Sequence, residues 1–599
     1  MKFGFKFGPD PNTAEPHLEL GAMTLLVGPN GAGKTLTLRE LCRSLKQRWP
    51  FISGVVGYDP QGIIHCIHTS DPRDALRPIW RERIVSALVP HVHTFFEGDP
   101  RGSLAPDNKL EHAIKWRVPL AERPEDHDEV VAYIRETVGE DIDIQDHRRV
   151  AERLVDKHPE SFGEFAPLTN HHVSLESRLR ALTNQDAHPL GKPPENHLMA
   201  LLTRPEVLDH LNQLLQEHVG FMLAVDPTAM TTLRAVTYDG AAERPPLDRP
   251  PWDPASLEWY RNARPLEERS HGQRLFASLL AEALVQESDF LLIDEPEVAL
   301  HPALALQLGT ILTDLAEERG LSIIAATHSD AFVAGCIATR APVTICRLDY
   351  SAGKGSAFVL DHDTLASMVN RPRLRAAGTL AALFHKAALI CEGPPDRVIY
   401  SEINHRLLAR EKDTYPRLMT DCHFLEYGGM TGIPEPLEML RACGVRTAAI
   451  LDLDVLLNDN RRTLAKLARA VGLADDAYRE LEAQREALSS MLAPKRPFPL
   501  DHDALVDHER AQLLACLDAL AAHGLFVCPH GELEDWLAGV GLDKRKKSEW
   551  STAALDWLGP IDSHPPQDGD VWGFMRRVAS WLASTAQRSA QSPSQQDQP

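Results

Sequence analysis

Short apolar runs alternate with amphipathic helical stretches in two parts of the chain. In the first part, which joins about 20–60 to 262–348, the runs Met23–Val27, Phe290–Ile293 and Leu321–Ala326 predict buried strands. Each run is followed by a segment whose apolar residues recur at helical spacing. Alternation of this kind is typical of a parallel sheet with helices on its faces, so we expect an α/β fold.

The same alternation returns in about 385–455 and 523–540. There the runs Ala387–Cys391, Val445–Leu451 and Leu525–Cys528 are the predicted strands. Because the two alternating parts are separated along the chain, they predict two α/β domains, each with its own parallel sheet.

Helical periodicity predicts an insertion in each domain. The pattern is mostly helical between about 70 and 260, as in RPEVLDHLNQLLQEHVGFMLAV, and again in a shorter stretch of the second domain. The last residues are rich in Ser, Gln and Pro and predict a disordered tail. The expected division is 1–70 and 261–350 for the first domain, 71–260 for its mainly helical insertion and dimerisation region, 351–384 for a connector, 385–583 for the second domain with an insertion at 458–522, and 584–599 for the tail.

Composition places the chain among globular proteins. Of its 599 residues, 43% are apolar and 25% are charged, which is enough to bury cores and too little charge for a disordered polyelectrolyte. The sequence contains neither an apolar run of roughly 18 residues nor the apolar core of a secretion signal, so we expect a cytoplasmic protein without a membrane span. Nine cysteines without a CxxC pair predict reduced, buried thiols.

The net charge limits how the chain could meet DNA. Lys and Arg total 63 against 85 for Asp and Glu, which gives −22. This excludes a protein that coats DNA by bulk charge, but it is compatible with a nuclease, whose metal-binding carboxylates add negative charge.

The string GPNGAGKT follows the first predicted strand and precedes a helical face. That is the context a phosphate-binding loop needs, and it disfavours a chance match in a glycine turn. The glycines let backbone N–H groups surround phosphate oxygens, the lysine reaches the β and γ phosphates, and the threonine hydroxyl ligates Mg²⁺. The predicted nucleotide-binding residues are Gly28, Asn30, Gly31, Gly33, Lys34 and Thr35.

Two later strands end in residues that complete a nucleotide site. Phe290–Ile293 is followed by Asp294 and Glu295. We expect Asp294 to hold Mg²⁺ through water and Glu295 to orient or deprotonate the attacking water. Leu321–Ala326 leads to His328, which then occupies the position of a γ-phosphate sensor. The cofactors predicted from this set are ATP and Mg²⁺.

An apolar helix upstream of Asp294 begins with Ser270-His271-Gly272-Gln273, and small residues at a helix start form an anion site. With the phosphate loop and the strand ends, this segment resembles the ABC-type ATPase head, in the branch shared with SMC proteins and RecF-like repair proteins. Their signature is LSGGQ, so the segment lacks the leucine and carries His271 in place of the first glycine. The resemblance implies that Ser270, Gly272 and Gln273 contact nucleotide held by a second subunit in an ATP-bridged homodimer.

Carboxylates follow the predicted strands of the second domain. Glu392 follows Ala387–Cys391, and Asp452 and Asp454 follow Val445–Leu451. The carboxyl ends of parallel strands converge at the crevice where such sheets bind ligands. Because Asp452 and Asp454 alternate along the chain, we expect both to project to one face and to share a divalent ion. The alternative, that these acids are solvated strand ends or helix caps, is disfavoured for the three jointly.

This EG…DxD arrangement is similar to the Toprim fold of topoisomerases, primases and several nucleases, over about 385–575. The resemblance implies that Glu392 is a metal ligand or acid/base group and that Asp452 and Asp454 carry Mg²⁺, with Mn²⁺ as a second usable ion. Glu534 resembles the acid that completes a second metal site, and Asp396 is the other candidate; two ions would clamp both oxygens of a phosphodiester. The sequence does not choose which basic residue completes the site among Lys544, Lys546, Lys547, Arg576 and Arg577.

Four histidines near the string DAHPLGKPPENH faintly resemble the core of an HNH nuclease. No paired metal ligands follow them at suitable spacing, so we expect surface histidines in a loop. They are His171, His172, His188 and His197.

An ABC-type head with a helical insertion, followed by a Toprim domain, resembles the overcoming-lysogenization-defect (OLD) family of nucleases, including the Gabija-type antiphage ATPase. The strings IDEPEVALHP and THSDAF add to that resemblance. It implies cleavage or nicking of DNA by the Toprim metals under nucleotide control, in antiphage defence or DNA repair, with a defence-system partner protein as a further implied contact.

Three other functions are weaker interpretations of the same residues. A RecF- or SMC-like ATPase with an inert Toprim docking module would be favoured by a replaced DxD aspartate, but both aspartates are present. A topoisomerase or primase needs a tyrosine or template-binding domain that nothing in the remaining length suggests. A transporter ATPase would not carry the Toprim-like half.

Overall fold

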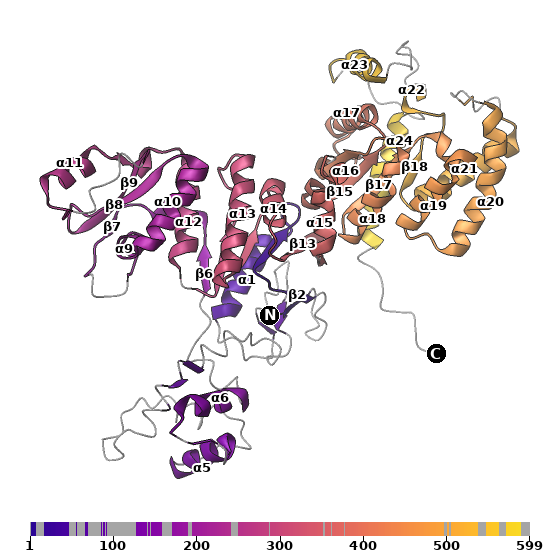
Figure 1. Ribbon diagram of the computed structural model, residues 1–599. Coiled ribbons are helices and arrows are strands. Elements are labelled where there is room, and N and C mark those ends of the chain that lie inside the picture. The colour runs from indigo at the N-terminus through magenta and orange to yellow at the C-terminus, as the bar shows by residue number, and fades with distance from the viewer. Residues whose placement is uncertain are drawn as a thin grey trace. The chain divides into compact units, whose positions relative to one another are not determined.

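The computed structural model is shown in Figure 1. It describes residues 2–6, 17–46, 55–56, 66–69, 85–86, 88–89, 92, 127–139, 142–143, 145–157, 170–189, 194–240, 249–286, 288–351, 354–360, 362–376, 378–495, 500–501, 505–536, 547–561, 563 and 571–588.

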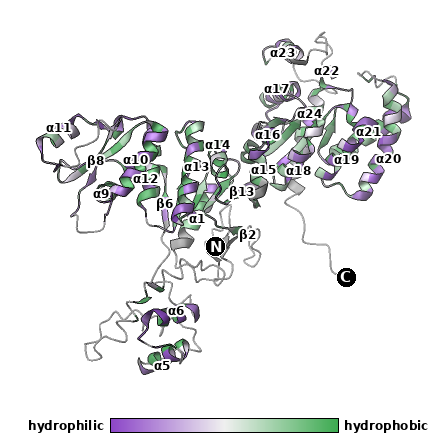
Figure 2. Cartoon of the chain, viewed as in Figure 1, coloured by the Kyte–Doolittle hydropathy of each residue, from purple (hydrophilic) through white to green (hydrophobic). Residues whose placement is uncertain are grey.

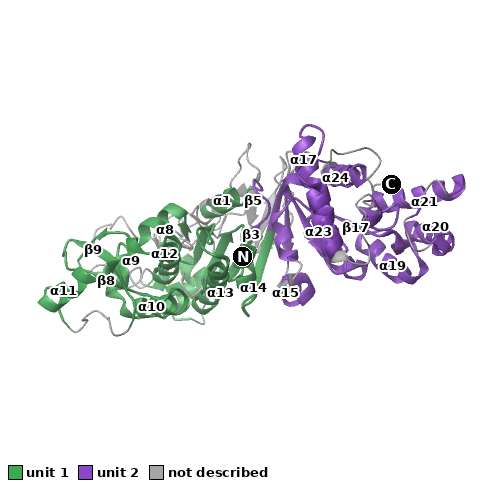
Figure 3. Cartoon of the chain, turned by 90° about the horizontal axis from the view of Figure 1, so that it is seen from above, with its two compact units in different colours: residues 1–26, 33–346 green, residues 27–32, 347–599 purple. Residues whose placement is uncertain are grey.

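The chain divides into two compact units, which Figure 3 colours separately. The first contains 1–26 and 33–346, and the second contains 27–32 and 347–599. Among the described helices, none combines the length and the apolar character needed to cross a membrane. In Figure 2 the sheet strands are mostly green, whereas α6 (His147–Lys157) and α20 (Asp475–Leu492) carry long hydrophilic stretches.

The first unit is built on a parallel sheet. The strands β3 (Met23–Val27), β12 (Ser322–Ala326), β11 (Phe290–Asp294) and β6 (Asn170–Val173) pair in this order, each parallel to the next. The full order is β14-β13-β3-β12-β11-β6, where β13 is Val343–Ser351 and β14 is Lys354–Leu360. Every residue of β3 and β12 is buried, as expected for parallel strands covered on both faces.

Four helices accompany this sheet and follow the sequence elements predicted to bind nucleotide. α1 (Lys34–Lys46) follows the phosphate loop, α12 (His271–Val285) begins within the signature segment, and α13 (Pro302–Arg319) and α14 (Asp330–Ile337) follow β11 and β12. Helices α13 and α14 pack closely because Gly309 has no side chain: a Cβ there would overlap the carbonyl oxygen of Phe332. These helices therefore fix the strand ends at which the predicted ligands lie.

The segment 71–260 contains strands as well as the predicted helices. β6 belongs to the parallel sheet, and β8 (Met222–Asp226) pairs antiparallel with β9 (Thr232–Tyr238). Helical periodicity missed them because β6 is short and polar, NHHV, and its partner β11 is distant in sequence. The other elements here are α5 (His127–Val138), α6, α8 (Leu175–Ala181), β7 (Gln185–Asp186), α9 (His197–Thr203), α10 (Pro205–Val219) and α11 (Pro254–Asn262).

A separate small sheet and two short pieces complete the described part of this unit. β1 (Lys2–Lys6), β2 (His17–Glu19), β4 (Val55–Val56) and β5 (Cys66–Thr69) form a sheet in the order β2-β1-β5-β4. β10 (Arg264–Pro265) pairs with β9 just before the signature segment. Helices α5 and α6 share a small apolar core that includes Ile134 and Leu154.

The second unit contains a four-stranded parallel sheet in the order β16-β15-β17-β18. The strands are β15 (Ala387–Cys391), β16 (Cys422–Glu426), β17 (Arg446–Leu451) and β18 (Leu525–Val527). This sheet and the one in the first unit confirm the predicted α/β class. The accompanying helices are α17 (Pro394–Arg410), α18 (Pro434–Ala442), α19 (Arg461–Ala470), α20, α21 (Asp507–Ala522), α22 (Leu533–Trp536), α23 (Lys547–Leu558) and α24 (Val571–Arg588).

The segment 351–384 is folded rather than a plain linker. It holds β14, α15 (His362–Asn370), α16 (Pro372–Ala376) and a short 3₁₀ helix, Thr379–Phe384. The buried Arg347 guanidinium donates to the carbonyl oxygens of Leu383, His385 and Gly444, so β13 is tied to the start of the β15 region. At the other end of the unit, α24 continues past the predicted start of the tail at Ser584 and ends at Arg588.

Candidate functional site

The loop between β3 and α1 has the backbone of a phosphate-binding loop. Gly28, Gly31 and Gly33 have φ values of 136°, 78° and 90°, a region that favours glycine. A Cβ on Gly28 would also overlap the carbonyl oxygen of Leu348. The glycines of GPNGAGKT are therefore required by the loop conformation and do not merely mark a turn.

Two predicted magnesium ligands of the nucleotide site lie together. The Thr35 hydroxyl donates to Oδ1 of Asp294 at 3.1 Å, although the two residues are far apart in sequence. Asp294 ends β11, and Thr35 begins the first turn of α1 beside the buried Lys34. The structure thus joins the phosphate loop to the acidic strand end, as a hydroxyl and a carboxylate that share one Mg²⁺ require.

The residues that follow β11 and β12 also approach each other. Nε2 of His328 lies 3.9 Å from Oε1 of Glu295. Burial and the charge of Lys34 lower the pKa of His328, partly offset by Asp294, so the imidazole is neutral at pH 7. The backbone N–H of His328 donates to Oε1 of Glu297 at 2.7 Å.

Arg178 of α8 supports this strand end, and the sequence analysis did not identify it. Its buried guanidinium donates to the carbonyl oxygens of Asp294, Glu295 and Pro296, at 2.9, 2.9 and 3.3 Å. Glu295 has a φ of 49°, which a non-glycine residue adopts only at some cost, so three bonds from one rigid group stabilise a strained turn. Its sequence context, ESRLRA, carries no signal of burial.

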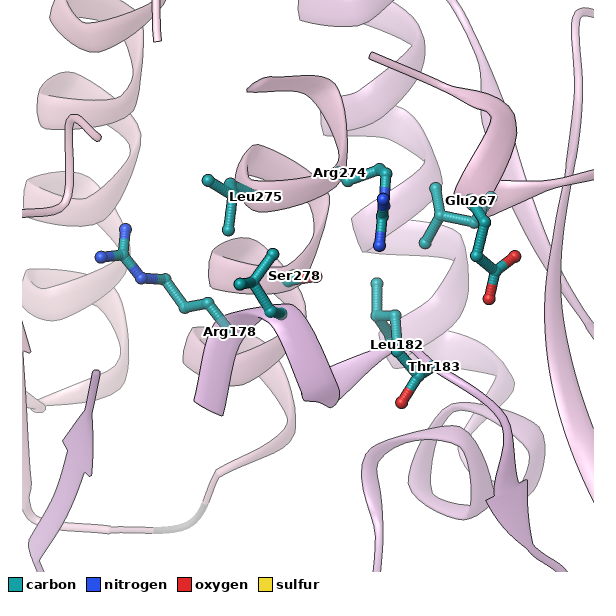
Figure 4. Close-up of a pocket in the computed structure, with 9 residues that line it drawn as sticks. Arg178, Leu182, Thr183, Glu267, Arg274, Leu275 and Ser278 are labelled. Atoms are coloured by element: carbon teal, nitrogen blue, oxygen red, sulfur yellow. The ribbon is translucent and has the colours of Figure 1, made fainter. Parts of the chain in front are cut away.

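Figure 4 shows Arg178 beside α12, with its guanidinium directed away from Arg274. The residues drawn there line a cavity of about 10 Å³, room for about one water molecule. The functional contact of Arg178 is therefore with the strand end and not with this cavity.

The signature segment forms the N-terminus of α12. The exposed Ser270 is the N-cap: its hydroxyl accepts from the N–H of Gln273 at 3.3 Å, and the Gln273 side chain accepts in return from the N–H of Ser270. A Cβ on Gly272 would lie 2.6 Å from the carbonyl oxygen of Ala299, so only glycine fits. The segment thus leaves a helix start open to solvent, where an anion is favoured.

Four predicted residues of the second unit line one pocket of about 520 Å³. Glu392 follows β15, Asp452 follows β17, Asp396 lies in the first turn of α17, and the buried Glu534 lies in α22. These are the carboxyl ends of neighbouring parallel strands and the elements that follow them. The pocket is also lined by Gly393, Pro394, Pro395, Val398, Gly428, Gly429 and Ser551.

Glu392 is an acid of this pocket whose pKa lies well above its ordinary value. Its Oε1 accepts from the N–H of Asp452 at 2.9 Å, and its carbonyl oxygen accepts from the N–H of Gly429 at 2.7 Å. Burial raises the pKa of Glu392 to about 7; the N–H of Asp452 opposes that shift, and the carboxylates of Asp454 and Asp396 add to it. Gathered negative charge of this kind is typical of a cation site.

The expected alternation of Asp452 and Asp454 on a strand is wrong. β17 ends at Leu451, and Asp454 lies in the 3₁₀ helix Leu453–Leu456. The chain turns here because the N–H of Leu453 bonds to the carbonyl oxygen of Gly531, outside the β17 ladder. Asp454 is not among the residues that line the pocket, and it reaches Glu392 through its charge.

Some of the acids also have structural roles. Oδ2 of Asp396 accepts from the N–H of Gly393 at 2.9 Å and so caps α17. Oδ2 of Asp535 accepts from the N–H of Glu532 at 2.9 Å. Asp396 is therefore both a pocket residue and a helix cap, which the sequence had given as alternatives.

Neither of the two candidate arginines is among the residues that line the pocket. Arg576 makes a two-pronged ion pair with Glu411, and Arg577 pairs with Asp518, so both guanidinium groups bind other elements. Lys544 and Lys546 lie outside the described residues, and Lys547 is the first residue of α23.

The expectation of surface histidines in a loop is wrong for three of the four. His171 and His172 lie in β6 and His197 begins α9. Of these, His171 and His197 contact the buried carboxylate of Glu282 in α12. Burial raises the pKa of Glu282, but the hydrogen bonds and charges of the two imidazoles outweigh it and lower the pKa to about 2. His188 instead lies 3.7 Å from Glu195.

Two family matches cover most of these residues. Residues 166–334 match an AAA domain family whose description names the AbiEii toxin and type IV toxin–antitoxin systems. This match includes the signature segment, Asp294 and His328. Residues 383–454 match the Toprim domain of overcoming-lysogenization-defect-like proteins, and include Glu392, Asp396, Asp452 and Asp454.

Individual curated proteins match about a quarter of the chain. The chain is 31% identical over 144 residues to a thiamine import ATP-binding protein, ThiQ, of Salmonella typhimurium, and 44% identical over 142 residues to ThiQ of Salmonella paratyphi A; each alignment covers 24% of the chain. The chain spans about half the length of these curated relatives, 55% and 54%. A solved Smc head domain from Pyrococcus furiosus aligns with 62% of the chain and 98% of its own, at 13% identity and a TM-score of 0.28.

The order of the two matched domains agrees with the order of the two sites. The acidic strand end and the signature helix lie within the ATPase-domain match, and Glu392, Asp396 and Asp452 of the carboxylate pocket lie within the Toprim match that follows it; the phosphate loop and Glu534 lie outside both matches. The chain therefore matches an ATPase–Toprim fusion of the OLD family, as its sequence motifs predicted.

Proposed function

We propose that this protein is an ATP-hydrolysing DNA endonuclease or nickase whose Toprim pocket cuts under the control of an ATPase dimer. The observation that carries the proposal is the convergence of Glu392, Asp396, Asp452 and Glu534 in one pocket of about 520 Å³. Four acids from separate elements gather negative charge, which a protein tolerates where a cation will balance it.

The donor set fits Mg²⁺ or Mn²⁺. All four side chains are carboxylates, the oxygen ligands that these ions prefer. Two bound ions would stabilise the attacking and leaving oxygens of a phosphodiester. With a pKa of about 7, Glu392 can hold or release a proton near neutral pH, which suits a general acid or base.

The ATPase unit would supply the control. Lys34 and the glycine loop bind the phosphates, Thr35 and Asp294 share Mg²⁺, and Glu295 orients the attacking water. Ser270 is exposed at the start of α12, so this anion site is open to nucleotide held by a second copy. This exposure supports the proposal of a homodimer closed by ATP, with 71–260 as the proposed dimerisation region.

The biological setting is part of the same proposal. The Toprim match is to OLD-like proteins, and we infer from it a role in antiphage defence, with DNA as the substrate and a defence-system protein as a partner. The two proposed activities use different residues, so each can be removed without the other.

The test is incubation of the purified full chain with supercoiled and linear DNA in Mg²⁺ or Mn²⁺, with and without ATP. Asp452→Ala should abolish nicking and cleavage while ATP hydrolysis continues, and Lys34→Ala should abolish ATP hydrolysis while Toprim metal binding continues. Asp476→Asn is the matched control, because that aspartate is 92% exposed and far from the pocket residues in sequence.

Three outcomes would count against the proposal. If Asp452→Ala lost ATP hydrolysis, the division into two sites would be wrong. If the wild-type chain bound DNA but left it intact in both metals, the Toprim domain would be a docking module. Cleavage that persisted in Asp452→Ala would place the nuclease elsewhere.

A further inference from the structure

Three side chains from distant parts of the first unit meet at one carboxylate oxygen. Nε2 of His171 lies 2.8 Å, and Nε2 of His197 lies 2.7 Å, from Oε2 of Glu282. Among the described residues, these form the one group of three His, Cys, Asp or Glu side chains whose ligand atoms all lie within 4.8 Å of one another.

The fold itself brings the three together. β6 pairs in parallel with β11, with His171 opposite Leu291, so His171 lies on the outermost strand of the sheet order. Glu282 lies near the end of α12, a helix that is buried from Leu275 to Leu284. His197 is the first residue of α9, whose N-cap Asn196 accepts from the N–H of Met199. Three separate elements thus supply one donor each.

Burial of the Glu282 carboxylate is energetically unfavourable unless a partner balances its charge. The Glu282 side chain is 1% exposed, on an otherwise apolar helix segment, and burying a carboxylate there costs several kcal/mol unless it is paired. His197 is 16% and His171 is 29% exposed, so the cluster is closed on the Glu282 side and open on the His171 side.

The donor set matches a metal ion of one chemical class. Two imidazole nitrogens and one carboxylate oxygen are the protein ligands of many zinc sites that keep a fourth position for water. Ligands at about 2.0–2.2 Å from Zn²⁺ lie about 3.4 Å apart, so the two nitrogens would move by only about 0.6 Å to admit the ion. The partly exposed side of His171 leaves access for the fourth ligand.

We propose that His171, His197 and Glu282 bind one divalent transition-metal ion of the Zn²⁺ class. The ion joins β6, α9 and α12 and holds them as a single body. α12 begins at the signature residue Ser270, and β6 leads through Ser174 into α8, which carries Arg178. The metal therefore stabilises the two elements that present the signature and support the acidic strand end.

The alternative is that no metal binds and that a proton lies in the hydrogen bonds between Glu282 and the two histidines. Both occupants use the same three side chains, but they differ in what the protein retains after chelation and reloading. The metal content is measured without DNA or ATP, so this inference and the proposed nuclease activity can fail separately.

The experiment loads the full chain with Zn²⁺ after removal of metals by a chelator, and measures bound zinc by elemental analysis after gel filtration. Glu392→Gln with Asp452→Asn provides a background in which the Toprim pocket is weakened. In that background the chain should keep one equivalent of Zn²⁺. His171→Gln with His197→Gln should lower the affinity by about 100-fold or more, since loss of even an outer-shell partner costs about 10- to 100-fold. His188→Gln is the matched control.

A second measurement does not depend on the variants folding. Co²⁺ loaded into the wild-type histidine site should give the intense visible bands of a four-coordinate ion, and Zn²⁺ should displace it. Three results would each overturn the proposal. One is a Co²⁺ spectrum with the weak bands of a six-coordinate ion. The others are equal zinc content in the background chain and in the double histidine variant, or no zinc in either.

Discussion

The two sites occupy the same position in their sheets, but the side chains around them differ in charge. Both put carboxylates at the carboxyl ends of parallel strands, Asp294 after β11 and Glu392 after β15. In the ATPase unit, the buried Lys34 and Asp294 both act on the pKa of His328, with opposite sign. Arg178 donates to the carbonyl oxygen of Asp294 and so supports the turn after β11. In the Toprim pocket, no Lys or Arg is among the described residues that line it.

The difference follows from what each site must bind. ATP brings its own negative charge, so its site contains cations before the ligand arrives. Under the proposed function, a phosphodiester cut by metal ions needs a site that first attracts cations, and the Toprim pocket gathers four carboxylates for this purpose. The comparison predicts that replacing a charged side chain by a neutral one has unequal effects in the two units.

The largest expected effect is on the Toprim side. Glu392→Gln keeps the shape of the side chain but removes the charge and the titrating group. Cleavage of DNA should fall by about 100- to 1,000-fold, the loss typical for one electrostatic group of an active site. The rates of plasmid nicking and of ATP hydrolysis are measured in parallel, with the exposed Glu480→Gln as control. Loss of ATP hydrolysis in Glu392→Gln would break the separation of the two sites.

Arg178→Ala should produce the next largest effect, and only in the ATPase unit. It leaves three carbonyl oxygens of a partly buried turn without their donor, which costs about 3 kcal/mol of stability. ATP hydrolysis should fall with it, because the turn at Glu295 loses its support. Urea unfolding and ATPase rates test this. Arg180→Ala, on the same helix but 76% exposed, is the control and should change stability by less than about 0.5 kcal/mol. Equal effects of the two substitutions would contradict the role given to Arg178.

Mg²⁺ should stabilise the Toprim unit by relieving repulsion among its acids. A ligand at 100 times its Kd adds about 2.7 kcal/mol. The expected result is slower hydrogen exchange in β15, β17 and β18 with Mg²⁺, reversed by a chelator and reduced in Glu392→Gln. If the variant gained as much protection as the wild type, the pocket would not be the cation site.

Ser270→Ala should have the smallest effect on stability. It removes the N-cap of α12, which is worth about 1 kcal/mol, so exchange should quicken in the first turn of that helix. Ser270→Thr keeps an acceptor oxygen and should restore protection. A loss of ATP hydrolysis in both variants would show that the hydroxyl position, and not the cap, matters for nucleotide.

The sequence predicts best the residues whose role depends on local order. The glycine loop, Asp294 and Glu392 all follow short apolar strands, and the structure places them at strand ends. Asp454 was placed on the wrong element, because an alternating DxD string does not reveal that the strand stops at Leu451.

Other residues could not be found because their role depends on distant partners. Arg178 and Glu282 sit in helical patterns in which a charged residue ordinarily faces solvent, and only the packing of α8 and α12 on the sheet buries them. The strand β6 is too short and too polar to be predicted, so its histidine was assigned to a loop. Non-local pairing therefore hid both the support of the ATPase site and the His–Glu–His cluster.

The helices α19, α20 and α21 between β17 and β18 have a consequence for synthesis. They separate Asp452 from Glu534 along the chain, although both line the same pocket. A nascent chain that has emerged only as far as Ala522 already carries Glu392, Asp396 and Asp452 but lacks the strand and the acid that complete the pocket. Closing so long a loop is slow compared with local helix formation. The order of residues along the chain therefore leaves the nascent protein without the full set of proposed metal ligands until β18 and α22 have been made.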